Sequence, residues 1–152
     1  MSPDLPEDGP VLVDASFVLA VLDGDEMAGR FADVMTRAVI TAVNLGEVLY
    51  KDESVAGLPP AEVAPGLRAT GLVTLPVTEA VAVRFTDLRA LDAKVRRRRK
   101  GRARSLSLAD LCCLGHAWEH GLPVLTGDKH WLAVVEAGLP VPVVDFRDPD
   151  AG

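Results

Sequence analysis

Four acidic residues that lie far apart in the chain could gather at a single site. Asp14 and Asp128 each follow a short apolar run, which is the position of a residue at the carboxyl end of a buried strand. Asp110 falls in the expected first turn of a helix, and Glu47 lies a little further into another. Because ligands of open α/β sheets bind at the carboxyl ends of the strands, these acids are candidates for one functional site.

Such a cluster of carboxylates needs a cation, and the residue types indicate which one. Two carboxylates about 4 Å apart repel each other by roughly 4 kcal/mol at an effective dielectric constant near 20. Ligation by oxygen alone, without a neighbouring cysteine or histidine, selects a hard ion such as Mg²⁺, for which Mn²⁺ can substitute. Such an ion activates water and stabilises the leaving oxygen in phosphodiester hydrolysis. The pattern therefore predicts metal-dependent hydrolysis without a covalent nucleophile.

Each of these acids also has a purely structural interpretation. Asp14 could begin a turn, and Glu47 could be a solvated charge on a helix. Asp110 is the third residue after Ser107, so it could complete an N-terminal capping box. Asp128 could cap the helix that follows it. The functional interpretation depends on the order and setting of the four acids together.

Apolar runs alternate with helical patterns along the chain, which predicts an α/β fold with a parallel sheet and helices on both faces. The expected strands are residues 11–14, 39–41, 72–77, 123–128 and 141–146. The first expected helix starts at Phe17, with Ser16 as its cap. Another runs from a cap at Ser107 to Gly121. The remaining expected helices cover residues 25–38, 42–57, 60–71, 78–95 and 128–138.

Composition predicts one domain over residues 1–152, with its core at about 10–146. The chain is 49% hydrophobic and has no apolar stretch long enough for a transmembrane helix. Its first ten residues are acidic and proline-rich, unlike a signal peptide. The neighbours Cys112 and Cys113 are expected to be reduced core residues. These features predict a cytoplasmic protein.

Four segments together resemble successive blocks of a PIN domain, specifically the VapC toxins of bacterial toxin–antitoxin pairs. They are VLVDASFVLAVLDGD, ITAVNLGEVLYK, SLSLADLCCLGHAWEHGLPVLTGDKHW and VPVVDF, and they span roughly residues 10–146. The resemblance implies a PIN-like α/β/α sandwich around a central parallel sheet of about five strands. It also implies Mg²⁺-dependent endoribonuclease activity on RNA, a VapB-like antitoxin partner and a homodimer.

Carried over by position, the resemblance implies roles for particular residues. The catalytic and metal-binding acids would be Asp14 in VDAS, Glu47 in NLGEV, Asp110 in LSLAD and Asp128 in LTGD. Supporting roles at the site would fall to Ser16, Asn44 and Thr126.

The segment RRRRKGRAR, residues 96–104, departs from the usual pattern of these toxins, whose connection is shorter and less charged. The formal net charge of the chain is −6, yet this segment alone carries +7 and everything else −13. Because the segment precedes the Asp110 helix, its arginines could hold RNA phosphates through forked hydrogen bonds. The candidates are Arg96, Arg97, Arg98, Arg99, Arg102 and Arg104. The alternatives are a solvated loop and a docking site for an acidic stretch of the antitoxin.

Three other functions are compatible with parts of the sequence. His116, Glu119 and His120 match the H-x-x-E-H signature of zinc peptidases, although the motif stands at a helix end before Gly121. The alternative is that both histidines are exposed on the polar side of a helix. A phosphatase of the haloacid-dehalogenase type needs a second aspartate where this chain has Ser16. A catalytically silent PIN-fold binding module is disfavoured because all four acids are present.

Overall fold

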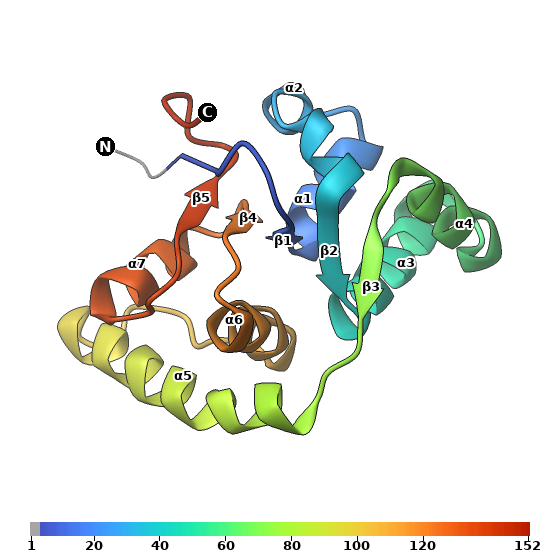
Figure 1. The fold of residues 1–152 in the computed structure, drawn as a ribbon. Helices are drawn as coiled ribbons and strands as arrows, with labels where there is room; N and C mark the ends of the chain where they lie inside the picture. Colours follow the sequence, from blue (N-terminus) through green and yellow to red (C-terminus); the bar gives the residue numbers. More distant parts are fainter. Residues whose placement is uncertain (1–3) are drawn as a thin grey trace.

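The computed structural model describes residues 4–152, except for the side chains of residues 54 and 55. The expectations for residues 1–3, which belong to the predicted domain and to the acidic N-terminal stretch, lie outside the described residues. The described strands form one parallel sheet in the order β3-β2-β1-β4-β5, which confirms the predicted α/β class (Figure 1). The strands are β1 (Val11–Val13), β2 (Ala38–Thr41), β3 (Val73–Leu75), β4 (Val124–Thr126) and β5 (Val143–Asp145).

Helices connect these strands and cover both faces of the sheet. They are α1 (Ala15–Leu22), α2 (Glu26–Gly29), α3 (Ala42–Ala56), α4 (Pro60–Thr70), α5 (Glu79–Arg98), α6 (Leu108–His120) and α7 (Lys129–Ala137). Figure 1 shows α5 and α6 side by side on one face, with α3 and α4 on the other side of the sheet. No helix within residues 4–152 is long and apolar enough to cross a membrane.

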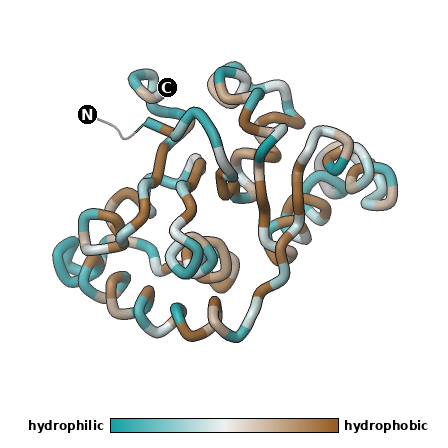
Figure 2. The backbone as a smooth tube through the Cα atoms, in the orientation of Figure 1, coloured by the Kyte–Doolittle hydropathy of each residue, from teal (hydrophilic) through white to brown (hydrophobic). Residues whose placement is uncertain are grey.

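The alternation of side chains along the strands divides the interior into two hydrophobic cores. Val11 and Val13 of β1 point to the core that contains Phe17 of α1. Leu12 between them points to the opposite core, with Leu114 of α6. Side chains of the sheet therefore pack into one core or the other, each covered by a layer of helices, as in an α/β/α sandwich. The strands are mainly brown, that is hydrophobic, in Figure 2.

The strand order places a switch point between β1 and β4. From β1 the chain builds outward through β2 to β3, and it then returns through α5 and α6 to place β4 on the other side of β1. Loops leave the carboxyl ends of β1 and β4 in opposite directions, which opens a crevice at this edge of a parallel sheet. Asp14 directly follows β1, and Asp128 comes two residues after β4.

The N-cap of one predicted helix and the extent of another differ from the structure. Asp14, not Ser16, is the N-cap of α1, because its Oδ1 accepts a hydrogen bond from the Phe17 amide at 3.2 Å. The predicted helix 25–38 is instead the short α2 followed by a 3-10 helix, Ala32–Arg37. Between them, Arg30 donates hydrogen bonds to the carbonyl oxygens of Asp148 and Ala151, so the chain is tied to the C-terminal segment there.

The basic segment is also more ordered than a loop. Arg96, Arg97 and Arg98 continue α5 beyond its expected end at residue 95, where positive charges suit the helix dipole. Lys100 and Gly101 then take positive φ angles of 52° and 73° and turn the chain back. This end of α5 forms a teal, hydrophilic tip in Figure 2.

The end of the basic segment is fastened by a buried carboxylate, Asp92 of α5. Its Oδ2 accepts hydrogen bonds from Ser105 Oγ at 2.9 Å and from the Leu106 amide at 3.0 Å. Its Oδ1 lies 3.0 Å from Nε2 of His130 at the start of α7. Burial acts to raise the pKa of Asp92, but the hydrogen bonds from Leu106, His130 and Ser105 outweigh it and hold the pKa below its usual value.

Replacing Asp92 by alanine is expected to destabilise the protein by about 1–3 kcal/mol, because buried donors then lose their acceptor. Denaturant unfolding measures the change. Asp87→Ala is the matched control on the same helix: Asp87 is an exposed acid that pairs only with Arg84 among the ion pairs of the described residues, and little change is expected.

The stabilisation by Asp92 should also depend on pH. Its pKa is lower in the folded protein than in the unfolded chain, so the contribution is present above the unfolded pKa and is lost as the pH falls through the folded pKa. Unfolding curves at several acidic pH values should show wild type losing more stability than Asp92→Ala. Parallel losses in the two proteins would contradict the assigned role.

Candidate active site

A cavity of about 270 Å³ opens at the carboxyl ends of β1 and β4. Three of the four predicted acids border it: Asp14, Glu47 and Asp128. Ser16, Lys51, Gly127 and Arg147 also line it, together with Ala15. The sheet edge predicted from the sequence is therefore a hollow with carboxylates on its wall.

Asp14 is the most constrained acid of this cavity. Its side chain is buried, and Oδ1 accepts hydrogen bonds from Ser16 Oγ at 2.7 Å and the Phe17 amide. Oδ2 accepts one from Thr126 Oγ1 of β4 at 2.7 Å. Burial raises the pKa of Asp14 above its usual value, the three hydrogen bonds oppose this, and the charge of Asp110 adds to the rise. Ser16 and Thr126 thus fix the carboxylate in one orientation.

The turn after β4 is bound to the same group of side chains. The Gly127 amide donates to Ser16 Oγ at 2.9 Å, and the Asp128 amide donates to Thr126 Oγ1 at 3.1 Å. A Cβ atom at Gly127 would come within 2.9 Å of the Phe146 ring, so the turn has room only for glycine. Asp128 caps α7 through its Oδ1, which accepts the His130 amide at 2.9 Å.

Asp110 approaches this site from α6. It forms the capping box with Ser107: the Ser107 amide donates to Asp110 Oδ2 at 2.8 Å, and the Asp110 amide donates to Ser107 Oγ at 3.1 Å. The same Oδ2 lies 3.8 Å from Nη2 of Arg104, which also forms an ion pair with Oδ2 of Asp128. Asp110 and Asp128 are therefore bridged by one guanidinium group.

Glu47 and Asn44 reach the site from α3. Glu47 Oε1 forms an ion pair of 2.7 Å with Lys51, one helical turn further on. Asn44 is buried, and its Nδ2 donates to the carbonyl oxygen of Ala109 at 3.3 Å. Asn44 therefore ties α3 to the start of α6, directly before Asp110.

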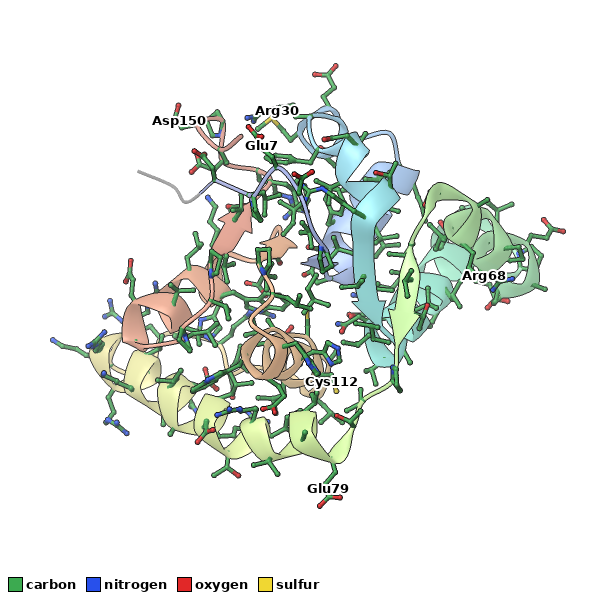
Figure 3. All side chains as sticks on the ribbon, in the orientation of Figure 1. Glu7, Arg30, Arg68, Glu79, Cys112 and Asp150 are labelled. Carbon is green, nitrogen blue, oxygen red and sulfur yellow. The ribbon has the colours of Figure 1, made fainter. Side chains whose placement is uncertain are left out.

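A buried thiol lies close enough to the acids to feel their charges. The pKa of Cys113 on α6 is raised well above its usual value, first by burial and then by the charges of Asp14, Asp110, Cys112 and Glu47. Asp14 after β1, Glu47 of α3 and Asp110 of α6 all lie near enough to contribute to this shift. Both cysteines are buried and unpaired, as the sequence predicted, and Cys112 is labelled on α6 in Figure 3.

The donor set suits a hard divalent cation, although the side chains are not yet arranged around one. Carboxylate oxygens from three elements border the cavity, which is the ligand chemistry of Mg²⁺ or Mn²⁺. Across residues 4–152, no three histidine, cysteine, aspartate or glutamate side chains already stand in an arrangement that could hold a metal ion. Lys51 forms an ion pair with Glu47, and Arg104 forms one with Asp128.

Two cationic residues of the cavity, Lys51 and Arg147, were not predicted. Lys51 follows Glu47 by four residues, a spacing at which opposite charges meet on a helix. Arg147 follows β5 at the same sheet edge, donates to the Gly127 carbonyl oxygen at 3.3 Å and stacks on Phe146. Only the position of Arg147 after the last strand could have indicated it.

The predicted arginines of the basic segment do not act as one group. Arg104 contacts the acids, whereas Arg96 and Arg97 border a separate hollow of about 460 Å³ with Lys100. The remaining three, Arg98, Arg99 and Arg102, are exposed.

The H-x-x-E-H motif does not form a zinc site among the described residues. Glu119 forms an ion pair of 2.8 Å with Arg84 of α5. We expected both histidines to be exposed; His120 is, but His116 is buried because α6 packs against both α5 and the sheet. Burial lowers the pKa of His116, with a further contribution from the neighbouring His120.

Comparisons with known proteins give the same fold. The DNA-bound VapBC from Salmonella typhimurium superposes with a TM-score of 0.65 at 22% identity, over 91% of this chain and 99% of that one. A toxin–antitoxin complex from Klebsiella pneumoniae superposes with a TM-score of 0.62 at 20% identity, over 90% of this chain and 97% of that one. For VapBC-5 from Mycobacterium tuberculosis the TM-score is 0.58 at 24% identity, over 91% of this chain and 99% of that one.

The sequence of this chain has no match among curated proteins. It does match the PIN domain family over residues 11–137, a range that includes β1 to α7 and all four predicted acids. The parallel sheet between two helical layers is the PIN α/β/α fold. This chain therefore belongs to the PIN domain family.

Proposed function

We propose that this protein is a metal-dependent endoribonuclease and the toxin of a toxin–antitoxin pair. The observation that carries the proposal is the gathering of acids from β1, α3, α6 and the β4–α7 turn at one sheet edge of a PIN fold. Membership of the family and the likeness of the fold to VapBC structures support the same function.

In this proposal Asp14, Glu47, Asp110 and Asp128 hold Mg²⁺, for which Mn²⁺ can substitute. A bound ion of this kind lowers the pKa of water and stabilises negative charge on the phosphate. Asp14 contributes a carboxylate that is already oriented by Ser16, Thr126 and the Phe17 amide. Its burial makes the uncompensated charge costly, which favours cation binding.

The cations around the cavity are suited to a polyanionic substrate such as RNA. Arg147 borders the cavity itself, and Arg104, the last residue of the basic segment 96–104, forms an ion pair with Asp128 of the cavity wall. Arginine forks bind phosphate oxygens in pairs. We propose that Arg96, Arg97, Arg98, Arg99, Arg102 and Arg104 contact the RNA backbone.

The partner in this proposal is a VapB-like antitoxin. The structures that share this fold include toxin–antitoxin complexes. A hollow of about 410 Å³ between α1, α3 and α4 offers an apolar surface, with Leu22 and Leu58 exposed, and Asp23 and Glu62 at its edge. We further propose a homodimer in the cytoplasm, and exposed Val83 and Leu108 supply apolar surface for self-association.

Removing one carboxylate charge should abolish RNA cleavage. We expect Asp14→Asn or Asp110→Asn to lower the cleavage rate at least about 100-fold, because several kcal/mol of transition-state stabilisation are lost. Asparagine at residue 14 can still cap α1, and at residue 110 its amide oxygen can still accept the Ser107 amide, so circular dichroism should show an unchanged fold. The assay is cleavage of total RNA with mapping of the new ends, together with growth arrest on expression.

Asp87→Asn serves as the matched control, since it removes one exposed carboxylate from α5 and should cleave as wild type does. Undiminished cleavage by Asp14→Asn or Asp110→Asn would defeat the proposal. A folded protein that binds RNA without cutting it would instead be a silent binding module.

Neutralising the arginines at the end of α5 should weaken RNA binding. In a variant with glutamine at residues 96–99, each lost phosphate contact should reduce the slope of log affinity against log salt by roughly 0.7 for single-stranded RNA. Binding of a labelled RNA to the inactive Asp14→Asn protein at several salt concentrations measures this slope. An unchanged slope would mean that these side chains are solvated and make no phosphate contact.

A further inference from the structure

One arginine of the basic segment occupies the acidic site itself. Nη2 of Arg104 pairs with Oδ2 of Asp128 and lies 3.8 Å from Oδ2 of Asp110. The Arg104 side chain is 56% exposed, whereas the two carboxylates are only 13% and 19% exposed. The guanidinium group therefore covers these acids from the solvent side.

The backbone around Arg104 is fixed, so its position is a property of the fold. Ala103 packs against the second hydrophobic core, and Leu106 is 2% exposed. The intervening Ser105 donates its hydroxyl proton to Asp92 at 2.9 Å. Arg104 thus stands between two residues that are held in place, and its own side chain is exposed.

Asp92 also positions the acid that Arg104 contacts. Its second oxygen lies 3.0 Å from Nε2 of His130, and the His130 amide donates to Asp128 Oδ1 at 2.9 Å. One buried carboxylate therefore aligns the segment that carries Arg104 and the start of α7 that carries Asp128.

A divalent cation and this guanidinium group need the same oxygen atoms. Oδ2 of Asp128 pairs with Arg104, so a metal ion that bound the same oxygen atom would lie next to the guanidinium group. Two cations at one carboxylate also repel each other, and most strongly where water is partly excluded. Occupation by the cation and occupation by Arg104 are therefore alternatives.

We propose that Arg104 is a built-in competitor of the divalent cation: it holds Asp110 and Asp128 in the metal-free protein and swings away when the ion binds. This inference rests on the proposed function, since it takes these acids to be part of the cation site. The competition lowers the affinity for the ion, so the site fills only when the ion is plentiful enough to displace the side chain.

The test is the affinity of the full-length, metal-free protein for Mn²⁺ alone, measured by calorimetry and by electron paramagnetic resonance of free Mn²⁺. Arg104→Ala should bind Mn²⁺ about three- to tenfold more tightly than wild type, given the strength of part-exposed ion pairs. Arg102→Ala is the matched control, because it removes the same charge from an exposed position of the same segment. Its affinity should stay within about twofold of wild type, since distant exposed charges are screened.

Thermal melting at low salt gives a second readout that does not depend on activity. Without metal, Arg104→Ala should melt below wild type, because Asp110 and Asp128 lose their counter-ion. Saturating Mn²⁺ should remove this difference, since the ion then compensates the acids in both proteins.

Asp128→Asn separates failure of this inference from failure of the proposed function. Suppose that Asp128→Asn weakens Mn²⁺ binding but Arg104→Ala binds Mn²⁺ no more tightly than wild type. The metal site of the proposed function is then supported, and competition by Arg104 is refuted. Weaker binding by Arg104→Ala would also refute it. If wild type takes up no Mn²⁺, or Asp128→Asn binds as wild type does, the metal site of the proposed function fails and the competitor fails with it.

Discussion

The structure depends on one costly feature, the burial of the Asp14 carboxylate at the end of β1. Burial raises its pKa, and the nearby charge of Asp110 raises it further. Three hydrogen bonds offset part of this cost, and two of them come from Ser16 in α1 and Thr126 in β4. The strand order that places β4 beside β1 is therefore what makes the site possible. A cation is the natural remaining compensation for charge held in this way.

Cationic side chains of the protein already meet part of this electrostatic demand. Lys51 pairs with Glu47, and Arg104 bridges Asp110 and Asp128. The ion pairs of Arg104 also connect the basic segment to the acidic site, whereas Arg96, Arg97 and Lys100 border a separate hollow.

Local patterns in the sequence predicted the sheet, most helix ends and the sheet edge at which the candidate acids lie. Apolar runs placed Asp14 and Asp128 at strand ends, and Gly57 and Gly121 end their helices in the left-handed conformation. Interactions between distant segments were beyond such patterns. From the sequence, Asp92 would be taken for a solvated charge on a helix. In the structure it is buried by its contacts with residues 105–106 and His130, which are distant in the chain. For the same reason neither the break in the predicted helix 25–38 nor the pairing of Arg104 could be predicted.

The most direct test of the central claim is a crystal structure of the protein soaked with Mn²⁺, located by its anomalous scattering. The account predicts one or more Mn²⁺ peaks in the cavity at the ends of β1 and β4, within ligand distance of Asp14 and Asp128. Diffraction that placed Mn²⁺ only elsewhere on the molecule, or left the acids bound to Arg104 at saturating Mn²⁺, would contradict it.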